Sequence, residues 1–402
     1  MNAPNLRFRG FKDEWKKVNF KNLFSERNVK TGEIEKYPLY SLTVSEGIVP
    51  KTDRYKRDFL VKKEDNFKVV YPNDFVSNPM NMTIGALDLY KGEKTVSVSG
   101  YYNVFTNDSS YRNYFLANYL TSEKMIWRYK SIATGSLIEK QRVHYSQFIE
   151  LQELLPSVEE AMQISNFLEL LDKRIYRQQE KVHLLQEQKK GYMQKIFKQE
   201  IRFKDDDGGD YPEWEVYKLK DFVERVNRKN AENMTNHPLT ISAQFGLVDQ
   251  MEYFNKKVAS ESLTGYYLLR KGEFAYNKSY SKGYPYGAIK RLDRYEHGAL
   301  STLYICFSPN KNVLSDFLVQ YFDSSAWYRE VSMVSVEGAR NHGLLNVSVT
   351  DFFETNHKLP SLEEQIKISN FLSELDDKLQ LEQQKLEALQ QQKKGFMQQM
   401  FI

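Results

Sequence analysis

The strongest constraint on the fold is a segment that occurs twice. Residues 155–197 align without a gap with residues 359–401, and 23 of the 43 aligned positions are identical. Both copies begin with LPS and a pair of glutamates, continue with ISNFL, and end with QKKG a few residues before a phenylalanine. Two unrelated polar helices would not keep one register over this length, so the chain contains an internal duplication.

A weaker repeat upstream of each copy divides the chain into four parts. Short motifs recur in the same order, and the stretches between them differ in the two halves. They are LRF at 6–8 and IRF at 201–203, EW at 14–15 and 213–214, and GIV at 47–49 and GLV at 246–248. We therefore expect a first variable domain over residues 1–154, a first helix over 155–200, a second variable domain over 201–358 and a second helix over 359–402.

Each matched segment has the pattern of a long helix that begins at a capping box. A proline is followed by a serine, and a glutamate lies three residues after the serine; these are Ser157 and Glu160 in the first copy and Ser361 and Glu364 in the second. In a capping box the serine hydroxyl accepts a hydrogen bond from a free amide of the first turn, and the glutamate accepts one in return. No later proline interrupts either segment.

Apolar residues recur along both helices at alternating spacings of four and three. The average of about 3.5 residues is the period of a coiled-coil seam. A helix with such a stripe needs a partner, and the even duplication favours an antiparallel pair within one chain; a coil between chains is the alternative. The predicted seam residues are Leu168, Leu171, Ile175, Val182 and Leu185 in the first copy and Leu372, Leu375, Leu379, Leu386 and Leu389 in the second.

The variable domains have the pattern of mixed α/β structure. Short runs typical of strands, such as KVVYP, TVSVSGYYNVF and LSTLYICF, are separated by stretches with Gly, Asn and Pro. Helical patterns cover residues 110–129 and 314–331. The predicted fold class is α+β, with two mixed α/β domains separated by two long antiparallel coiled-coil helices in a tandem repeat with pseudo-twofold symmetry.

Composition excludes several classes of function. No run reaches the roughly 18 consecutive apolar residues of a membrane-spanning helix, and the start, MNAPNLRFRGFKDEW, lacks the apolar core of a signal peptide. Cys306 is the only cysteine, so neither an internal disulfide nor a two-cysteine metal site can form. A Walker phosphate loop, a dinucleotide fingerprint and a G-x-S-x-G elbow are also missing. We expect a cytoplasmic protein without catalytic residues and without a metal site.

Basic and amide side chains gather in a few polar loops of both variable domains. Lysine and arginine suit phosphate contacts, and arginine and asparagine pair with base edges in the major groove of DNA. Each cluster alone is also compatible with an ordinary solvated loop, but the clusters recur at similar places in both domains. The candidate DNA-binding residues are Lys51, Arg54, Lys56, Arg57, Asn78, Asn81, Lys140, Arg142, Lys278, Lys282, Lys290, Arg291, Arg294, Arg340 and Asn341.

The whole chain resembles the specificity subunit of Type I restriction-modification systems. The resemblance is carried by LPSVEEAMQISNFLELLDKRI…QKKGYMQKIF and LPSLEEQIKISNFLSELDDKL…QKKGFMQQMF, together with the upstream stretches LRFRGFKDEW and IRF…YPEW. In that family the variable domains are target-recognition domains, and each reads one half of a split, asymmetric site in double-stranded DNA. The resemblance implies that the two helices set the gap between the half-sites and dock two modification subunits.

The resemblance also implies which chemistry belongs to the partner subunits. Modification subunits carry S-adenosylmethionine and methylate adenine at N6, and two restriction subunits, which use ATP and Mg, complete the nuclease. The chain itself would be non-catalytic, would hold no cofactor and would not bind a membrane. The alternative is a non-catalytic coiled-coil adaptor that binds only proteins, which a formal net charge of only +4 favours. An undetected nuclease or methyltransferase is the least favoured reading.

Overall fold

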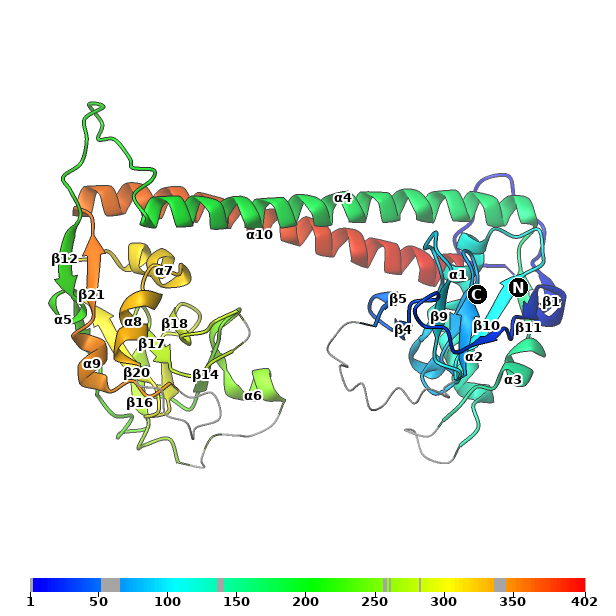
Figure 1. The fold of residues 1–402 in the computed structure, drawn as a ribbon, viewed down its shortest axis with the longest axis horizontal. Coiled ribbons are helices and arrows are strands. Elements are labelled where there is room, and N and C mark those ends of the chain that lie inside the picture. Colours follow the sequence, from blue (N-terminus) through cyan, green and yellow to red (C-terminus); the bar gives the residue numbers. More distant parts are fainter. Residues whose placement is uncertain are drawn as a thin grey trace. The chain divides into compact units, whose positions relative to one another are not determined.

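Contacts divide the chain into two compact units, which are coloured along the sequence in Figure 1. Unit 1 comprises residues 1–180 and 384–402, and unit 2 comprises residues 181–383. Each unit therefore contains one group of strands and a part of both long helices. The computed structural model describes residues 3–51, 66–135, 141–255, 259, 262–281, 283–335 and 345–401.

Unit 1 contains a four-stranded antiparallel sheet, smaller sheets and short helices. The four-stranded sheet has the order β2-β10-β7-β8, a three-stranded sheet has the order β3-β6-β9, and β4-β5 and β1-β11 form pairs. The strands are β1 (Lys16–Asn19), β2 (Phe24–Glu26), β3 (Lys30–Thr31), β4 (Tyr40–Thr43), β5 (Gly47–Pro50), β6 (Phe67–Val70), β7 (Phe75–Ser77), β8 (Leu87–Leu89), β9 (Val96–Val98), β10 (Asn103–Asn107) and β11 (Gln152–Leu155). The helices are η1 (Phe20–Asn22), η4 (Met82–Ile84), α1 (Asn113–Leu120), α2 (Glu123–Ile132) and α3 (Tyr145–Ile149).

Unit 2 follows the same plan with a larger second sheet. One four-stranded sheet has the order β13-β20-β17-β18, another has the order β15-β14-β19-β16, and β12 pairs with β21. The strands are β12 (Glu215–Lys218), β13 (Val223–Arg225), β14 (Pro238–Ser242), β15 (Gly246–Asp249), β16 (Tyr267–Arg270), β17 (Phe274–Asn277), β18 (Ala288–Arg291), β19 (His297–Leu300), β20 (Ile305–Pro309) and β21 (Asn356–Leu359). The helices are α5 (Leu219–Phe222), α6 (Gln250–Phe254), α7 (Ser315–Asp323), α8 (Tyr328–Val334) and α9 (Val349–Phe353).

The repeat reaches into the cores of the two units. In unit 1 the rings of Phe75 and Phe105 stack with centroids 5.4 Å apart, and in unit 2 Phe274 and Phe307 stack at the same distance. Each pair joins the two central strands of its sheet, β7 and β10 in unit 1 and β17 and β20 in unit 2. The prediction of two related α/β domains is confirmed, although their surface loops have little sequence in common.

Both helical patterns predicted within the variable domains are interrupted. Residues 110–129 contain α1 and most of α2, with a break at Ser122, whose hydroxyl accepts a hydrogen bond from the amide of Met125 at 3.4 Å. Residues 314–331 contain α7 and the start of α8. There Ser324 caps the end of α7, because its hydroxyl donates to the carbonyl of Tyr321 at 2.6 Å. Serine side chains compete with the backbone ladder in this way and favour helix boundaries.

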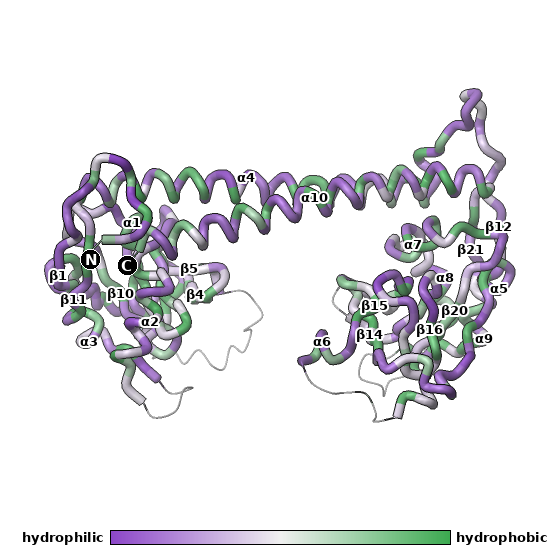
Figure 2. Tube along the Cα trace, turned by 180° about the vertical axis from the view of Figure 1, so that it is seen from behind, coloured by the Kyte–Doolittle hydropathy of each residue, from purple (hydrophilic) through white to green (hydrophobic). Residues whose placement is uncertain are grey.

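The matched segments form two long helices, α4 (Val158–Phe197) and α10 (Leu362–Met400). Hydrophobic residues recur among hydrophilic ones along both of them (Figure 2). All ten predicted seam residues are buried or half-buried. Leu168 and Leu372, which occupy equivalent positions in the two copies, are fully buried.

In unit 1 the start of α4 packs antiparallel against the end of α10. The rings of Phe167 and Phe396 meet edge to face at 5.0 Å. One turn further along α4, the carboxylate of Asp172 pairs with Lys393 Nζ at 2.6 Å. The partner number falls as the α4 number rises, so the two helices run in opposite directions.

Unit 2 repeats this packing with the roles of the two helices exchanged. Tyr192 of α4 meets Phe371 of α10 at 5.2 Å, and Lys189 Nζ pairs with the carboxylate of Asp376 at 2.5 Å. These four residues are the sequence equivalents of Phe396, Phe167, Lys393 and Asp172. Antiparallel pairing within one chain is thus confirmed in each unit, and the polar contacts keep the register found in the other unit.

A buried glutamate joins each helix start to the chain that enters the domain. Glu160 is only 2% exposed; it accepts hydrogen bonds from Arg7 at 2.8 and 2.7 Å and from Trp15 Nε1 at 3.2 Å. Glu364 of unit 2 is fully buried. It accepts hydrogen bonds from Arg202 at 2.8 and 3.3 Å and from the Trp214 indole at 3.0 Å.

This arrangement corrects the predicted capping box. The serine half is present, since Ser157 and Ser361 accept hydrogen bonds from the amides of Glu160 and Glu364 at 3.2 and 3.3 Å. The glutamate carboxylates, however, are bound by arginine and tryptophan. Burial beneath the entering strand removes each carboxylate from water, and a buried charge needs a paired and hydrogen-bonded partner.

The first residues of the chain contact the last turns of α10. The amide of Leu6 donates to the carbonyl of Gln399 at 3.2 Å. In unit 2 the amide of Ile201 donates to the carbonyl of Lys195 at 3.3 Å. Gln399 is the sequence equivalent of Lys195, so Leu6 makes with α10 the contact that Ile201 makes with α4.

Replacing Glu364 with Gln should destabilise unit 2, because Arg202 would lose its buried carboxylate partner and keep only the exposed Glu213. We expect the free energy of unfolding to fall by about 3 kcal/mol, seen as a lower urea midpoint. The exposed neighbour Glu363 provides the matched control, and Glu363→Gln should change stability by no more than about 0.5 kcal/mol. Equal effects of the two substitutions would contradict the role given to the buried carboxylate.

Unit 2 should also lose stability in mild acid through His357. This side chain is 3% exposed and hydrogen-bonded on both ring nitrogens, to Tyr321 and Thr355, each at 2.8 Å. Burial lowers its pKa from 6.5 to about 4. The unfolded chain therefore binds the proton more tightly, and stability present above pH 6.5 is lost as the pH falls toward 4.

The loss attributable to His357 at pH 5 should be about 2 kcal/mol relative to pH 7. Urea unfolding between pH 5 and 8 measures it, and a His357→Phe variant should show a correspondingly smaller dependence on pH. The same substitution at His183, which is exposed on α4, serves as control. An unchanged pH dependence in the His357 variant would refute this assignment.

Candidate nucleic-acid interface

Eight of the fifteen candidate DNA-binding residues lie in the described part of the chain. Lys51, Asn78, Asn81 and Arg142 belong to unit 1, and Lys278, Lys290, Arg291 and Arg294 belong to unit 2. The remaining candidates, Arg54, Lys56, Arg57, Lys140, Lys282, Arg340 and Asn341, lie outside the described residues.

In unit 1 the loop after β7 is held next to the strand-like segment before α3. The side chain of Asn78 accepts a hydrogen bond from the amide of Met80 at 3.1 Å, which fixes a tight turn. Asn81 is exposed at the start of η4. The amide of Val143 donates to the carbonyl of Pro79 at 3.0 Å. This bond brings exposed Arg142 close to the asparagine loop, so two predicted clusters form one surface.

Lys51 belongs to a different edge of unit 1. It follows β5, and its amide donates to the carbonyl of Leu39 at 3.0 Å. Its backbone is therefore anchored beside the β4-β5 hairpin rather than beside the asparagine loop.

In unit 2 the loop after β17 has the same anchorage. The amide of Leu345 donates to the carbonyl of Lys278 at 2.9 Å, as Val143 does to Pro79. The ammonium group of Lys278 also turns inward and donates to the carbonyl of Val347 at 3.1 Å. The structure thus gives Lys278 a role in holding this loop.

Two further basic residues of unit 2 are engaged in ion pairs. Lys290 Nζ lies 2.5 Å from the carboxylate of Asp323 at the end of α7. Arg291 pairs with Asp293 at 2.6 Å and with Asp316 at 2.7 Å. Arg294, three residues beyond β18, is exposed. Among these β18 cations, Arg294 is therefore the one whose exposed side chain best suits a phosphate contact.

A cleft of about 250 Å³ opens in unit 2 between the β14-β15 hairpin and the loop that follows β17. Its lining is mostly polar and aromatic, with Ser242 and Gln244 on one side and Asn277, Ser279 and Tyr280 on the other. Hydroxyl and amide groups of this kind can donate to and accept from base edges. The sequence shows the GLV motif of β15 as part of the repeat, but the hairpin side of this cleft has no basic residue to mark it as a candidate interface.

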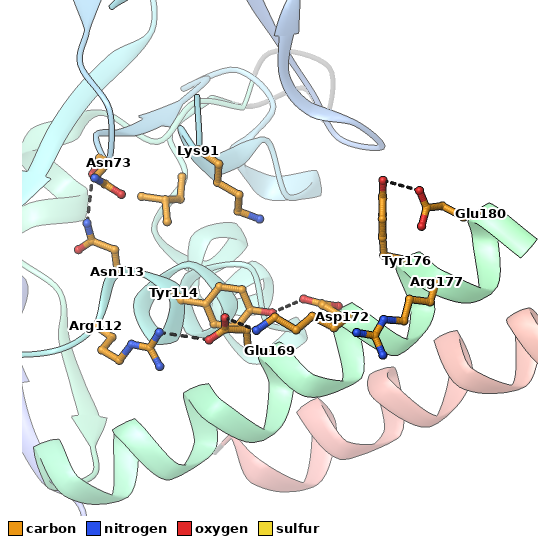
Figure 3. Close-up of a pocket in the computed structure, with 12 residues that line it drawn as sticks. Asn73, Lys91, Arg112, Asn113, Tyr114, Glu169, Asp172, Tyr176, Arg177 and Glu180 are labelled. Atoms are coloured by element: carbon orange, nitrogen blue, oxygen red, sulfur yellow. Dashed lines mark hydrogen bonds and ion pairs between the residues drawn. The ribbon is translucent and has the colours of Figure 1, made fainter. Parts of the chain in front are cut away.

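Unit 1 has a larger cavity, of about 780 Å³, where α1 faces the middle of α4 (Figure 3). The Tyr114 hydroxyl donates to the carboxylate of Asp172, and Arg112 contacts Asn166 at 2.7 Å and Glu169 at 3.2 Å. Hydrogen bonds from Lys173 and Arg112 lower the pKa of Glu169. These contacts fasten the domain to the helix and leave Tyr176 at the mouth of the cavity, 60% exposed.

Both long helices also carry apolar side chains away from the seam. Leu170 of unit 1 is 62% exposed and Leu184 of unit 2 is 67% exposed, and other exposed apolar residues are Met162, Ile366 and Leu381. The seam period did not reveal them, because they lie outside its positions. Two of them, Met162 and Ile366, occupy equivalent positions in the two copies of the repeat.

The described residues contain no group of three or more His, Cys, Asp or Glu side chains that could hold a metal ion. Cys306 is buried, and burial raises the pKa of its thiol to about 12. Within the same residues, no helix combines the length and apolar character needed to cross a membrane.

Comparison with known proteins agrees with this geometry. Residues 193–391 match the family model described as the Type I restriction modification DNA specificity domain. The fold is similar to the S subunit of the Type I restriction-modification system from M. genitalium, with a TM-score of 0.55 and 14% identity, covering 100% of this chain and 99% of that one.

A second similar structure comes from work on complex assembly and conformational transition of the type I R-M system. It has a TM-score of 0.54 and 13% identity, and the match covers 98% of each chain. At these identities the two structures establish the shared fold, while the family model identifies the sequence of the second half. Residues 193–391 therefore belong to the family of the Type I restriction modification DNA specificity domain, and the first half of the chain repeats their architecture and helix sequence.

Proposed function

We propose that this chain is the DNA-reading subunit of a Type I restriction-modification complex and recognises a bipartite, asymmetric site in double-stranded DNA. The observation that carries the proposal is one architecture present twice with different surface loops. Two related domains with unlike loops are suited to reading two unlike sequences. One reader would be the variable domain of residues 1–154 and the other that of residues 201–358.

The two long helices support a role in assembly. Each unit has the same seam register, and the exposed Met162 of unit 1 has its sequence equivalent in the exposed Ile366 of unit 2. Two equivalent surfaces are expected to bind two copies of one partner. We infer that they dock two modification subunits, and that residues 155–200 and 359–402 act as spacer between the half-sites as well as docking surface. Restriction subunits would join this assembly.

The chain itself would carry out no chemistry. In the proposed complex, S-adenosylmethionine would bind to the modification subunits, and ATP and Mg to the restriction subunits. The place of action would be the cytoplasm, where the DNA is. Purified with and without its modification subunit, the chain should support methyl transfer into DNA only when that subunit is present. Transfer by the isolated chain would contradict the proposal.

A protein-only adaptor remains the second candidate, because Lys290 and Arg291 are paired within the chain and the net charge is only +4. A gel-shift titration of the complex with the modification subunit separates the two functions. The DNA-reading function requires a sequence-selective shift that weakens with salt. The adaptor would give no selective shift.

Exchange of one domain should alter one half of the recognised site. If residues 1–154 are replaced by the corresponding domain of another specificity subunit, the half-site read by unit 1 should change, while the other half and the gap stay the same. The matched exchange of residues 201–358 should change the other half. Mapping of methylated adenines by single-molecule sequencing measures both, and a change in both halves after one exchange would contradict the modular reading.

Arg294 and Arg291 should differ in their contribution to DNA binding. Arg294→Ala should weaken binding to all sequences and reduce the slope of log affinity against log salt by about 1, as expected for loss of one phosphate contact. Arg291→Ala should leave that slope nearly unchanged and lower stability, because Arg291 already pairs with Asp293 and Asp316. Affinity measured across a salt series tests this, and the reverse pattern would disprove it.

A further inference from the structure

We propose that the tip of the β14-β15 hairpin reads bases in the half-site bound by unit 2, and that the tip of the β4-β5 hairpin does so in the other half-site. The inference rests on the proposed function and names residues outside the basic clusters. In unit 2 the reading side chains are Gln244 and Phe245, and in unit 1 they are Ser45 and Glu46.

The two hairpins have the same geometry. In unit 1 Thr43 pairs with Gly47 across a three-residue loop, and in unit 2 Ser242 pairs with Gly246 across a loop of the same length. The glycines have φ values of +69° and +78°. Glycine adopts this left-handed backbone conformation without steric cost, so each hairpin uses it directly after the loop.

The same side-chain hydrogen bond fixes both loops. The hydroxyl of Thr43 accepts from the amide of Glu46 at 3.0 Å, and the hydroxyl of Ser242 accepts from the amide of Phe245 at 3.2 Å. These are equivalent positions of the two hairpins. A hydroxyl that caps its own loop restrains the backbone, so the tip side chains project from a defined support.

The tips differ in every side chain although their backbones match. Unit 1 presents Val44, Ser45 and Glu46, and unit 2 presents Ala243, Gln244 and Phe245. In a protein that repeats one scaffold to read two different sequences, specificity is expected where the backbone is kept and the side chains change. Phe245 is 58% exposed, so its large apolar ring lies in water when nothing is bound to the loop.

The neighbourhood of the unit 2 tip is suited to base edges. Gln244 lines the 250 Å³ cleft together with Asn277, Ser279 and Tyr280 from the loop after β17. Tyr280 is also well exposed. The tip is therefore not an isolated protrusion, since amides, hydroxyls and aromatic rings from two separate loops face the same space.

The chemistry of the tips gives each a base preference. A glutamine carboxamide can pair with the N6 and N7 edge of adenine, and an aromatic ring suits contact with the methyl group of thymine. A glutamate carboxylate accepts from N4 of cytosine and is repelled by phosphates. We therefore assign adenine to the base contacted by Gln244 and cytosine to the base contacted by Glu46.

The test uses the complex of the full chain with its modification subunit and duplexes altered at one base pair at a time. Wild type defines the preferred site. In Gln244→Ala, discrimination at one adenine position of one half-site should fall roughly tenfold or more, while the other half-site and the gap stay unchanged. In Gln244→Glu, the preference at that position should move from adenine toward cytosine.

Matched variants separate this reading from a general loss of binding. Glu46→Gln should alter one position of the other half-site, moving it from cytosine toward adenine. Glu232→Ala, at an exposed residue of unit 2, should leave the preferred site as in wild type. Co-purification of each variant with the modification subunit shows whether the variant chain still folds and assembles.

Two negative outcomes are distinguishable. If wild type shows no sequence preference, the proposed function fails and the inference falls with it. If wild type is selective and the Gln244 and Glu46 variants keep its full preference, the proposed function stands and the hairpin assignment is overturned. Changes in both half-sites from Gln244→Ala would overturn it as well.

Discussion

The buried carboxylates of Glu160 and Glu364 are the contacts on which the remaining structure of each unit depends. Each lies in the first turn of a long helix, yet its partners, an arginine and a tryptophan, come from the segment that leads into the neighbouring sheet. A charge at such a site is tolerated only while its partners are in place. The helix start, the entering segment and the sheet are therefore ordered together, which gives the exposed loops of each unit a rigid base.

The duplicated scaffold keeps its geometry while equivalent positions change their chemistry. His357 of β21 is neutral, buried and bound to two hydroxyls, whereas its equivalent in β11, Glu153, pairs with Lys124 and Arg128. Both solutions satisfy a buried polar group. The same tolerance at the exposed loops is what a subunit with two unlike recognition domains requires, because loop residues can change without loss of the supporting core.

Sequence periodicity was sufficient to identify the residues of the coiled-coil seam, but the sequence could not show which residues of the candidate interface are exposed. Leu168 and Leu372 were identified correctly, because a period near 3.5 is visible in the sequence and the duplication names the partner helix. The pairing of Lys290 with Asp323 joins residues 33 positions apart, on a strand and a helix whose contact no local pattern reveals. Exposed cations and internally paired ones look alike in a sequence. The hairpin tips were not predicted as DNA-reading residues, because what they share is a backbone conformation and their side chains differ.

The contact between Leu6 and Gln399 has a consequence for how the fold is encoded. Ile201 follows α4 directly in the chain, and its amide donates to the carbonyl of Lys195 in that helix. Leu6 makes the equivalent hydrogen bond to Gln399 of α10, a helix far from it in the sequence. At the end of α10 the two segments are brought together by folding alone, whereas at the end of α4 they are also consecutive in the chain. A junction of this kind is therefore encoded by the packing at the helix end, and it forms whether or not the two segments are consecutive in the sequence.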